Sequence, residues 1–107
     1  MNFRIFLLYN GFMFNGRHCS ISDYELLVRE TESYLATLKR KDNDAFSIYL
    51  DRFIDLVNQF DSSIGESLKR KILVHKEKEE FEIVERIVKE SLEPLKRNVL
   101  VDIQEHA

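Results

Sequence analysis

The adjacent pair His18 and Cys19 is the one place where side chains able to bind a metal or attack a substrate stand next to each other. Neighbouring residues seldom share one ion at the tetrahedral angles that zinc prefers. Two more histidines, His75 and His106, are distant in sequence, and no C-x-x-C, H-E-x-x-H or E-x-x-H spacing is present. A cysteine nucleophile also needs a base and an orienting group, which no local pattern supplies. We therefore predict no metal site and interpret Cys19 as a small buried apolar residue.

The common phosphate-binding and nucleophile motifs are missing from the sequence. There is no G-x-G-x-x-G, no P-loop lysine and no nucleophile elbow, and the chain has 3 glycines. Acids spaced like Asp51 and Asp55 are ordinary on an exposed helix face. The sequence thus predicts no catalytic residue, no cofactor and no enzymatic activity.

Acidic residues gather in the segment 42–61, which holds five aspartates against one arginine. Asp44, Asp51 and Asp55 recur at helical spacing, so they share one face of a helix, and Asn58 lies beside them. This face is either a solvated surface opposite an aromatic stripe or a docking face for a basic protein. Complementary charge would then speed encounter and set specificity. We predict that these four residues contact a partner protein.

Three basic clusters are the alternative place to look for a partner: 39–41, 69–71 and 96–97. Acids flank each of them, and the whole chain has a net charge of −3, which opposes nucleic-acid binding. The break at 61–65 and the basic helix that follows are nevertheless compatible with a helix-turn-helix. A small DNA-binding regulator that uses residues 61–72 is therefore our alternative hypothesis.

Helical periodicity and capping signals predict the elements that carry these residues. Helices are expected at 22–41, 45–60 and 64–93, the first and third opened by the capping boxes Ser22-x-x-Glu25 and Ser63-x-x-Glu66. The polar run at 75–80 contains no turn residue, which favours one long helix over two. Pro94 is expected to end or kink that helix, and residues 99–103 fit a short strand or a final helical turn.

The first 19 residues form an apolar segment with few charges. A β-hairpin turning at Asn10-Gly11 and a short helix over 3–9 both fit it. In either form we expect the segment to pack on a helical body made of residues 20–107, although an exposed partner-binding patch at 12–14 is also compatible with the pattern.

Length and composition predict a single small helical domain. The chain has 107 residues, 44% of them hydrophobic and 33% charged, with 1 proline. These values favour a mainly α fold, a three- to four-helix bundle with a possible short N-terminal β-hairpin or strand. One cysteine forbids an internal disulfide, and we find neither a signal peptide nor a membrane-spanning segment. We expect a cytoplasmic protein.

These observations together favour a protein that works by binding another protein. In size, acidity and lack of catalytic motifs the chain is similar to bacterial immunity or antitoxin proteins, which cover basic toxins such as nucleases. That similarity implies a stoichiometric inhibitor with a basic partner and no membrane contact. A structural homodimer built on the apolar stripe at 81–95 is a further alternative.

Overall fold

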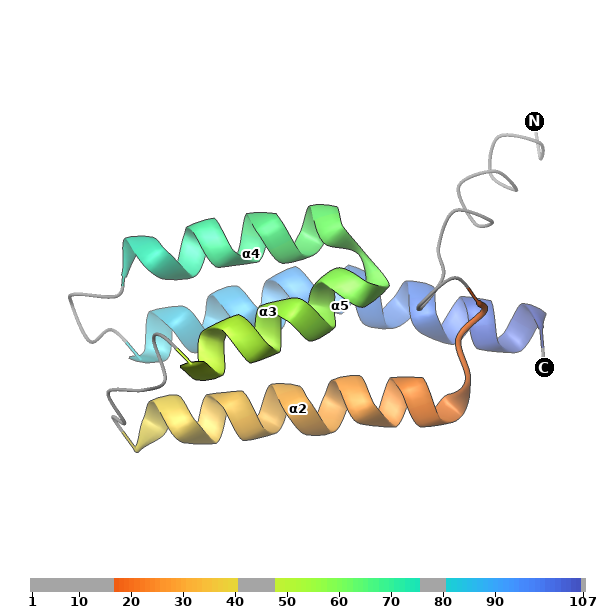
Figure 1. Cartoon of the computed structure of the whole chain (residues 1–107), viewed down its shortest axis with the longest axis horizontal. Coiled ribbons are helices and arrows are strands. Elements are labelled where there is room, and N and C mark those ends of the chain that lie inside the picture. The colour runs from red at the N-terminus through yellow and green to blue at the C-terminus, as the bar shows by residue number, and fades with distance from the viewer. Residues whose placement is uncertain (1–16, 41–47, 76–80, 107) are drawn as a thin grey trace.

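The computed structural model describes residues 17–40, 48–75 and 81–106, which form four α-helices (Figure 1). They are listed here in chain order: α2 (Ile21–Lys39), α3 (Ile48–Phe60), α4 (Ser62–Val74) and α5 (Phe81–Glu105). The helices pack along one another, and the C-terminal part of α5 runs past α3 and α4 beside the start of α2. The predicted mainly α, small-bundle fold is confirmed.

A single core joins the four helices because each turns an apolar stripe inward. Leu27 of α2, Ile54 of α3, Leu68 of α4 and Val88 of α5 are at most 2% exposed and belong to one cluster. Burying an aliphatic side chain of this size contributes about 1.5–3 kcal/mol. Tertiary burial of this kind, more than local helix propensity, holds such helices.

The start of α2 lies earlier than predicted, and its cap is Ser20 instead of Ser22. The Ser20 hydroxyl accepts a hydrogen bond from the Asp23 amide at 3.3 Å, and the Asp23 carboxylate accepts one from the Ser20 amide at 2.8 Å. Arg17 also binds that carboxylate, with N–O distances of 2.7 and 3.0 Å. Asp23 therefore fills the third position of the capping box, where the sequence analysis had placed Glu25.

The prediction of one helix over 64–93 is wrong, because α4 ends at Val74 and a separate helix, α5, begins at Phe81. Its predicted cap is wrong too: Asp61 caps α4, and its carboxylate accepts from the Ser63 and Ile64 amides. The apolar stripes of α4 and α5 enter the same core only when the two helices pack side by side, as they do here. The burial of both apolar stripes in one core thus favours two helices, although the sequence between them contains no turn residue.

The helix α5 continues through Pro94 to Glu105. Of the alternatives that the sequence left open, a helix end near Glu93 and a strand at 99–103 are therefore wrong, whereas the helical alternative for residues 99–103 is confirmed. Pro94 is exposed, while Leu95 and Val99, which follow it in sequence, are fully buried. Their burial offsets the hydrogen bond that proline cannot make.

The apolar stripe at 81–95 faces the core, where Val84, Val88, Leu92 and Leu95 are at most 1% exposed. The burial of these four residues in the bundle's own core lends no support to the homodimer alternative, which stays an untested hypothesis. The predictions for residues 1–16 and for the start of the helix at 45–60 lie outside the described residues. Among the helices described, none is both long and apolar enough to cross a membrane.

Candidate functional site

Two of the predicted partner-binding residues lie on the outer face of α3. Asp51 and Asp55 are exposed, on the side of the helix opposite the buried Phe53 and Val57. Asp44 lies outside the described residues. The structure therefore presents two carboxylates to solvent, about one helical turn apart.

One basic residue of α4, Lys69, lies close to this acidic face. The Asp51 carboxylate is 3.9 Å from Lys69 Nζ, and both side chains are well exposed. Asp55 makes no ion pair within the described ranges. Exposed ion pairs contribute little to stability, so Asp51 stays available to another cation.

Asn58, the fourth predicted residue, belongs to the corner between α3 and α4. Its Nδ2 donates to Glu66 Oε2 at 3.2 Å, while its buried Oδ1 finds no partner in the described part of the chain. The side chain packs against Gly65, where any Cβ would meet it. Asn58 thus helps to fix the corner between α3 and α4, and it does not belong to the exposed pair of carboxylates.

The geometry of this corner also bears on the DNA-binding alternative. Asp61 is the single residue between α3 and α4, and the two helices run back along each other (Figure 1). In a helix-turn-helix the two helices cross steeply so that the second can enter the major groove. The antiparallel hairpin lends no support to that alternative.

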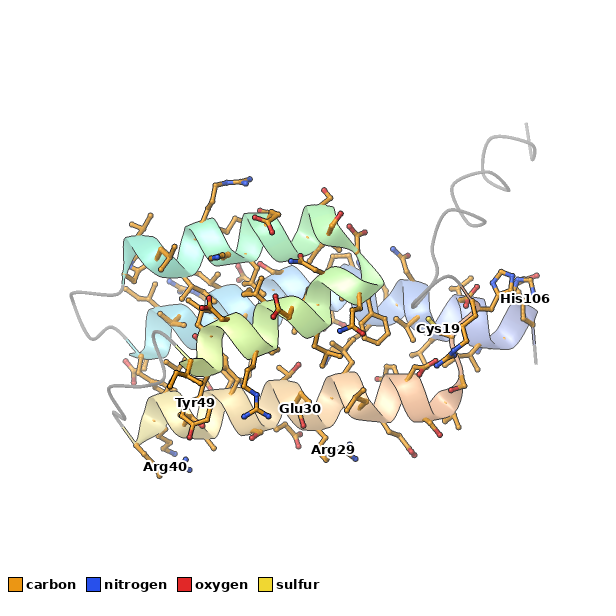
Figure 2. The ribbon with its side chains drawn as sticks, in the orientation of Figure 1. Cys19, Arg29, Glu30, Arg40, Tyr49 and His106 are labelled. Carbon is orange, nitrogen blue, oxygen red and sulfur yellow. The ribbon has the colours of Figure 1, made fainter. Side chains whose placement is uncertain are left out.

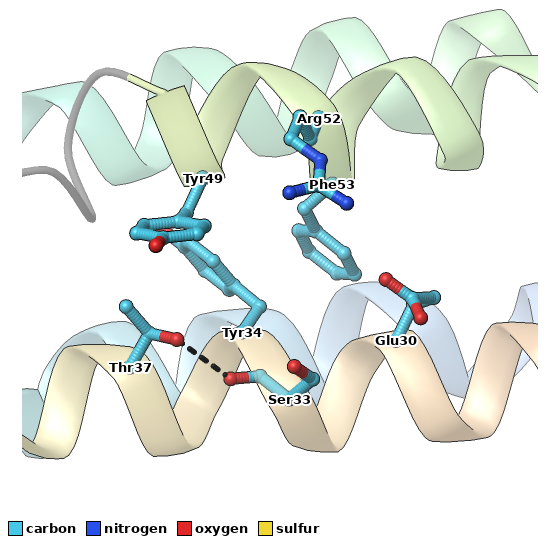
Figure 3. A pocket seen from close by; sticks show the side chains of 7 residues that line it. All are labelled: Glu30, Ser33, Tyr34, Thr37, Tyr49, Arg52 and Phe53. Atoms are coloured by element: carbon cyan, nitrogen blue, oxygen red, sulfur yellow. Dashed lines mark hydrogen bonds between the residues drawn. The ribbon is translucent and has the colours of Figure 1, made fainter.

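A small groove opens between α2 and α3 (Figure 3). Its volume is about 70 Å³, and polar and aromatic side chains line it: Glu30, Ser33, Tyr34, Thr37, Tyr49, Arg52 and Phe53. The Tyr34 hydroxyl is buried and finds no hydrogen-bond partner in the described part of the chain. Burial raises the pKa of this phenol well above its usual value. The groove has room for a few waters or the tip of one polar side chain.

A second group of polar residues, which the sequence analysis missed, lies where the start of α2 meets the end of α5. His18 Nδ1 is 3.0 Å from Asp102 Oδ1, and His106 Nε2 is 3.8 Å from the same oxygen. The two imidazole rings stack, with centroids 3.6 Å apart and planes 13° from parallel. Two histidines and a carboxylate thus share one small volume.

The carboxylate of this group is held from inside the protein. Asp102 is fully buried, and its Oδ2 accepts a hydrogen bond from the Cys19 amide at 2.5 Å. The side chains of His18 and His106 are 34% and 35% exposed, so they form the solvent side of the group. Figure 2 shows Cys19 and His106 together at this end of the bundle.

Cys19 itself is a buried apolar residue, as predicted. Burial, together with the negative charges of Asp102 and Asp23, raises the pKa of its thiol to about 12. The thiol therefore stays protonated at neutral pH. Nucleophilic attack requires the thiolate, so this cysteine is unsuited to catalysis.

One local signal points to the histidine–aspartate group in retrospect. Asp102 and His106 are four residues apart, a spacing that places both on one helix face. His18 is 84 residues from Asp102, and only the packing of α2 on α5 brings it there. The searched metal motifs are local in sequence, so they could not reveal this group.

Comparisons with protein families, with curated protein sequences and with solved structures find no match to this chain.

Proposed function

We propose that this protein binds a basic partner protein through the outer face of α3 and acts as its stoichiometric inhibitor. The observation that carries the proposal is the exposure of Asp51 and Asp55 about one turn apart on that face. Paired carboxylates of this kind attract a positively charged partner and orient it before contact.

An exposed apolar residue of α3 and the groove between α2 and α3 add to the case. Ile48 is 56% exposed on the same helix, three residues before Asp51. Protein interfaces combine such an apolar contact with a polar rim, and they are enriched in tyrosine and arginine, which Tyr49 and Arg52 supply at the groove.

An inhibitor of the immunity or antitoxin kind is the form of this function that we propose. The chain is small and acidic, and its α3 face suits a basic enzyme such as a nuclease. An inhibitor of this kind needs no catalytic residue. We place the protein in the cytoplasm, where a lone cysteine stays reduced.

The test compares two double variants that change net charge equally. The partner is captured with the wild-type chain, and association is then followed at two salt concentrations. We expect Asp51→Lys with Asp55→Lys to slow association about tenfold or more at low salt and to flatten its salt dependence. The control, Glu25→Lys with Glu32→Lys on exposed positions of α2, should associate nearly as the wild type does.

Both variants should keep the far-UV circular dichroism spectrum of the wild type, because all four positions are exposed. Undiminished association of the α3 variant would show that its carboxylates do not guide the partner. A heparin column checks the nucleic-acid alternative: the chain should flow through at moderate salt, whereas strong retention would favour a polyanion partner.

A further inference from the structure

We propose that His18, Asp102 and His106 bind a divalent transition-metal ion of the zinc type at the junction of α2 and α5. Imidazole nitrogen and carboxylate oxygen are established zinc ligands, whereas sites for Mg²⁺ and Ca²⁺ are built mainly from oxygen. The proposal is independent of the partner-binding face on α3, which lies on a different helix.

The ligand atoms are nearly close enough to share one ion. One nitrogen from each histidine and one oxygen of Asp102 all lie within 4.8 Å of one another. Ligands about 2.1 Å from zinc lie about 3.4 Å apart at the tetrahedral angle. The observed distances of 3.0 and 3.8 Å to Asp102 Oδ1 fall on either side of that value. To coordinate one ion, the two partly exposed rings must leave their stacked arrangement and turn one nitrogen each toward it.

The surroundings of Asp102 resemble the outer shell of a metal site. The Cys19 amide binds Oδ2, which leaves Oδ1 facing the two imidazoles. Partners of this kind fix the orientation of a ligating carboxylate. Asp102 is fully buried, and burying a carboxylate is costly unless nearby positive charge or hydrogen bonds compensate it. A bound cation supplies such compensation directly.

The site is also reachable, and its ligands come from distant parts of the chain. Both histidine side chains are about one-third exposed, so an ion can enter from solvent without unfolding. Three protein ligands leave one coordination position for water or another group. Because His18 precedes α2, Asp102 lies on α5 and His106 directly follows α5, an ion here would tie the start of α2 to the end of α5.

The experiment uses the full chain without an affinity tag, treated with EDTA and then dialysed. Zinc chloride is titrated by calorimetry, and melting is recorded with and without the ion. We expect one equivalent of Zn²⁺ to bind and a saturating concentration to raise the melting temperature by on the order of 10 °C. Magnesium chloride should cause no shift. Co²⁺ should give visible absorption bands that report its coordination by the protein.

Two single variants and one control identify the ligands. His106→Ala and His18→Ala should each weaken zinc binding at least about tenfold and abolish the cobalt bands. His75→Ala removes the remaining histidine, which caps α4 outside this group, and should bind zinc as the wild type does. If His18→Ala fails to fold, His106→Gln serves as the second variant, because His106 lies after the last residue of α5 and its side chain is partly exposed.

Three results would overturn the proposal. The first is a wild-type chain that binds no zinc, and the second is zinc binding that survives the loss of His106. The third is a set of variants that melt earlier without metal while zinc leaves the wild-type melting temperature unchanged. That last pattern would mean that Asp102 joins the two histidines only to hold α2 against α5.

Discussion

At the scale of single residues, polar side chains fix the beginning of the described chain. Asp23 and Asp102 are both buried, and each accepts a hydrogen bond from a backbone amide just before α2, Asp23 from Ser20 and Asp102 from Cys19. Arg17 pairs with the first and His18 with the second. A buried carboxylate is tolerated only when it is bound in this way. These contacts therefore set where α2 begins more sharply than its apolar pattern does.

Asp23 gives the first prediction, a stability loss that depends on pH. The Arg17 side chain, aided by the Ser20 amide and hydroxyl, holds the pKa of this carboxyl below its usual value of 3.8. Its contribution to stability is thus present above about pH 3.8 and is lost as the pH falls through the lowered pKa. Asp23→Asn should lower the free energy of unfolding at pH 7 by about 1–2 kcal/mol.

Urea unfolding at a series of pH values from 7 downward measures this effect. The difference between the wild type and Asp23→Asn should shrink as the pH falls below 3.8. Glu25→Gln, an exposed change in the same part of α2, should stay within about 0.5 kcal/mol of the wild type at every pH. A difference that persists undiminished in acid would show that the charge of Asp23 is not what stabilises α2.

Tyr34 gives the second prediction, in which removing a polar atom does not lower the stability of the protein. Its ring is 3% exposed and stacks on Phe53 with centroids 4.8 Å apart, while its hydroxyl finds no partner in the described part of the chain. Burying an unpaired hydroxyl costs free energy. Tyr34→Phe keeps the ring and should leave the free energy of unfolding unchanged or raise it by up to about 1 kcal/mol.

Chemical denaturation of both proteins tests this expectation. Tyr49→Phe is the control, because that ring lines the same groove but is only half-buried, and it should change stability by less than about 0.5 kcal/mol. A loss of more than 1 kcal/mol for Tyr34→Phe would mean that the hydroxyl is hydrogen-bonded in solution.

At the scale of elements, the corner between α3 and α4 depends on a close approach at Gly65. A Cβ at this position would overlap Asn58 Oδ1 and lie 2.8 Å from Asn58 Cγ and 3.3 Å from its backbone nitrogen. The sequence pattern alone suggests only that glycine is tolerated early in a helix. The structure gives it a specific role, because the missing side chain lets the two helices meet.

The third prediction is that Gly65→Ala destabilises the hairpin through Asn58. We expect a loss of about 1–3 kcal/mol, because a well-packed contact has no room for the added methyl group. In an Asn58→Ala background the loss should be much smaller, since only the backbone contact at 3.3 Å remains and alanine favours the helix. The four proteins of this double-mutant cycle are compared by urea unfolding. Equal losses in both backgrounds would show that the two positions are not coupled.

At the scale of the whole molecule, the sequence predicted what local periodicity can determine. The stripes of α2 and α3 are regular at 3.6 residues, so their helical state and inward faces followed from the pattern. The separation of α4 from α5 did not follow from the pattern, because residues 75–80 carry no turn signal. The free energy that favours two helices comes from the burial of Leu68 and Val88 in one core. Of the sites, the exposure of Asp51 and Asp55 was predictable, whereas the meeting of His18 with Asp102 was not.

The last prediction concerns the core that all four helices share. Leu68 of α4 is fully buried in the cluster that also contains residues of α2, α3 and α5. Leu68→Ala should therefore lower the free energy of unfolding of the entire bundle by about 2–5 kcal/mol. Leu100→Ala, on an exposed position of α5, should cost less than about 1 kcal/mol.

The two variants are compared by urea unfolding, followed both by far-UV circular dichroism and by tyrosine fluorescence. Because one core joins the helices, both signals should change in a single transition at the same urea concentration, and Leu68→Ala should shift them together. The chain has 4 tyrosines, of which Tyr24 and Tyr34 lie on α2 and Tyr49 on α3, so the fluorescence signal reports mainly on these two helices and not on α4. If its transition stayed in place while the helical signal moved, α4 would unfold on its own, and the bundle would consist of two units with separate stabilities.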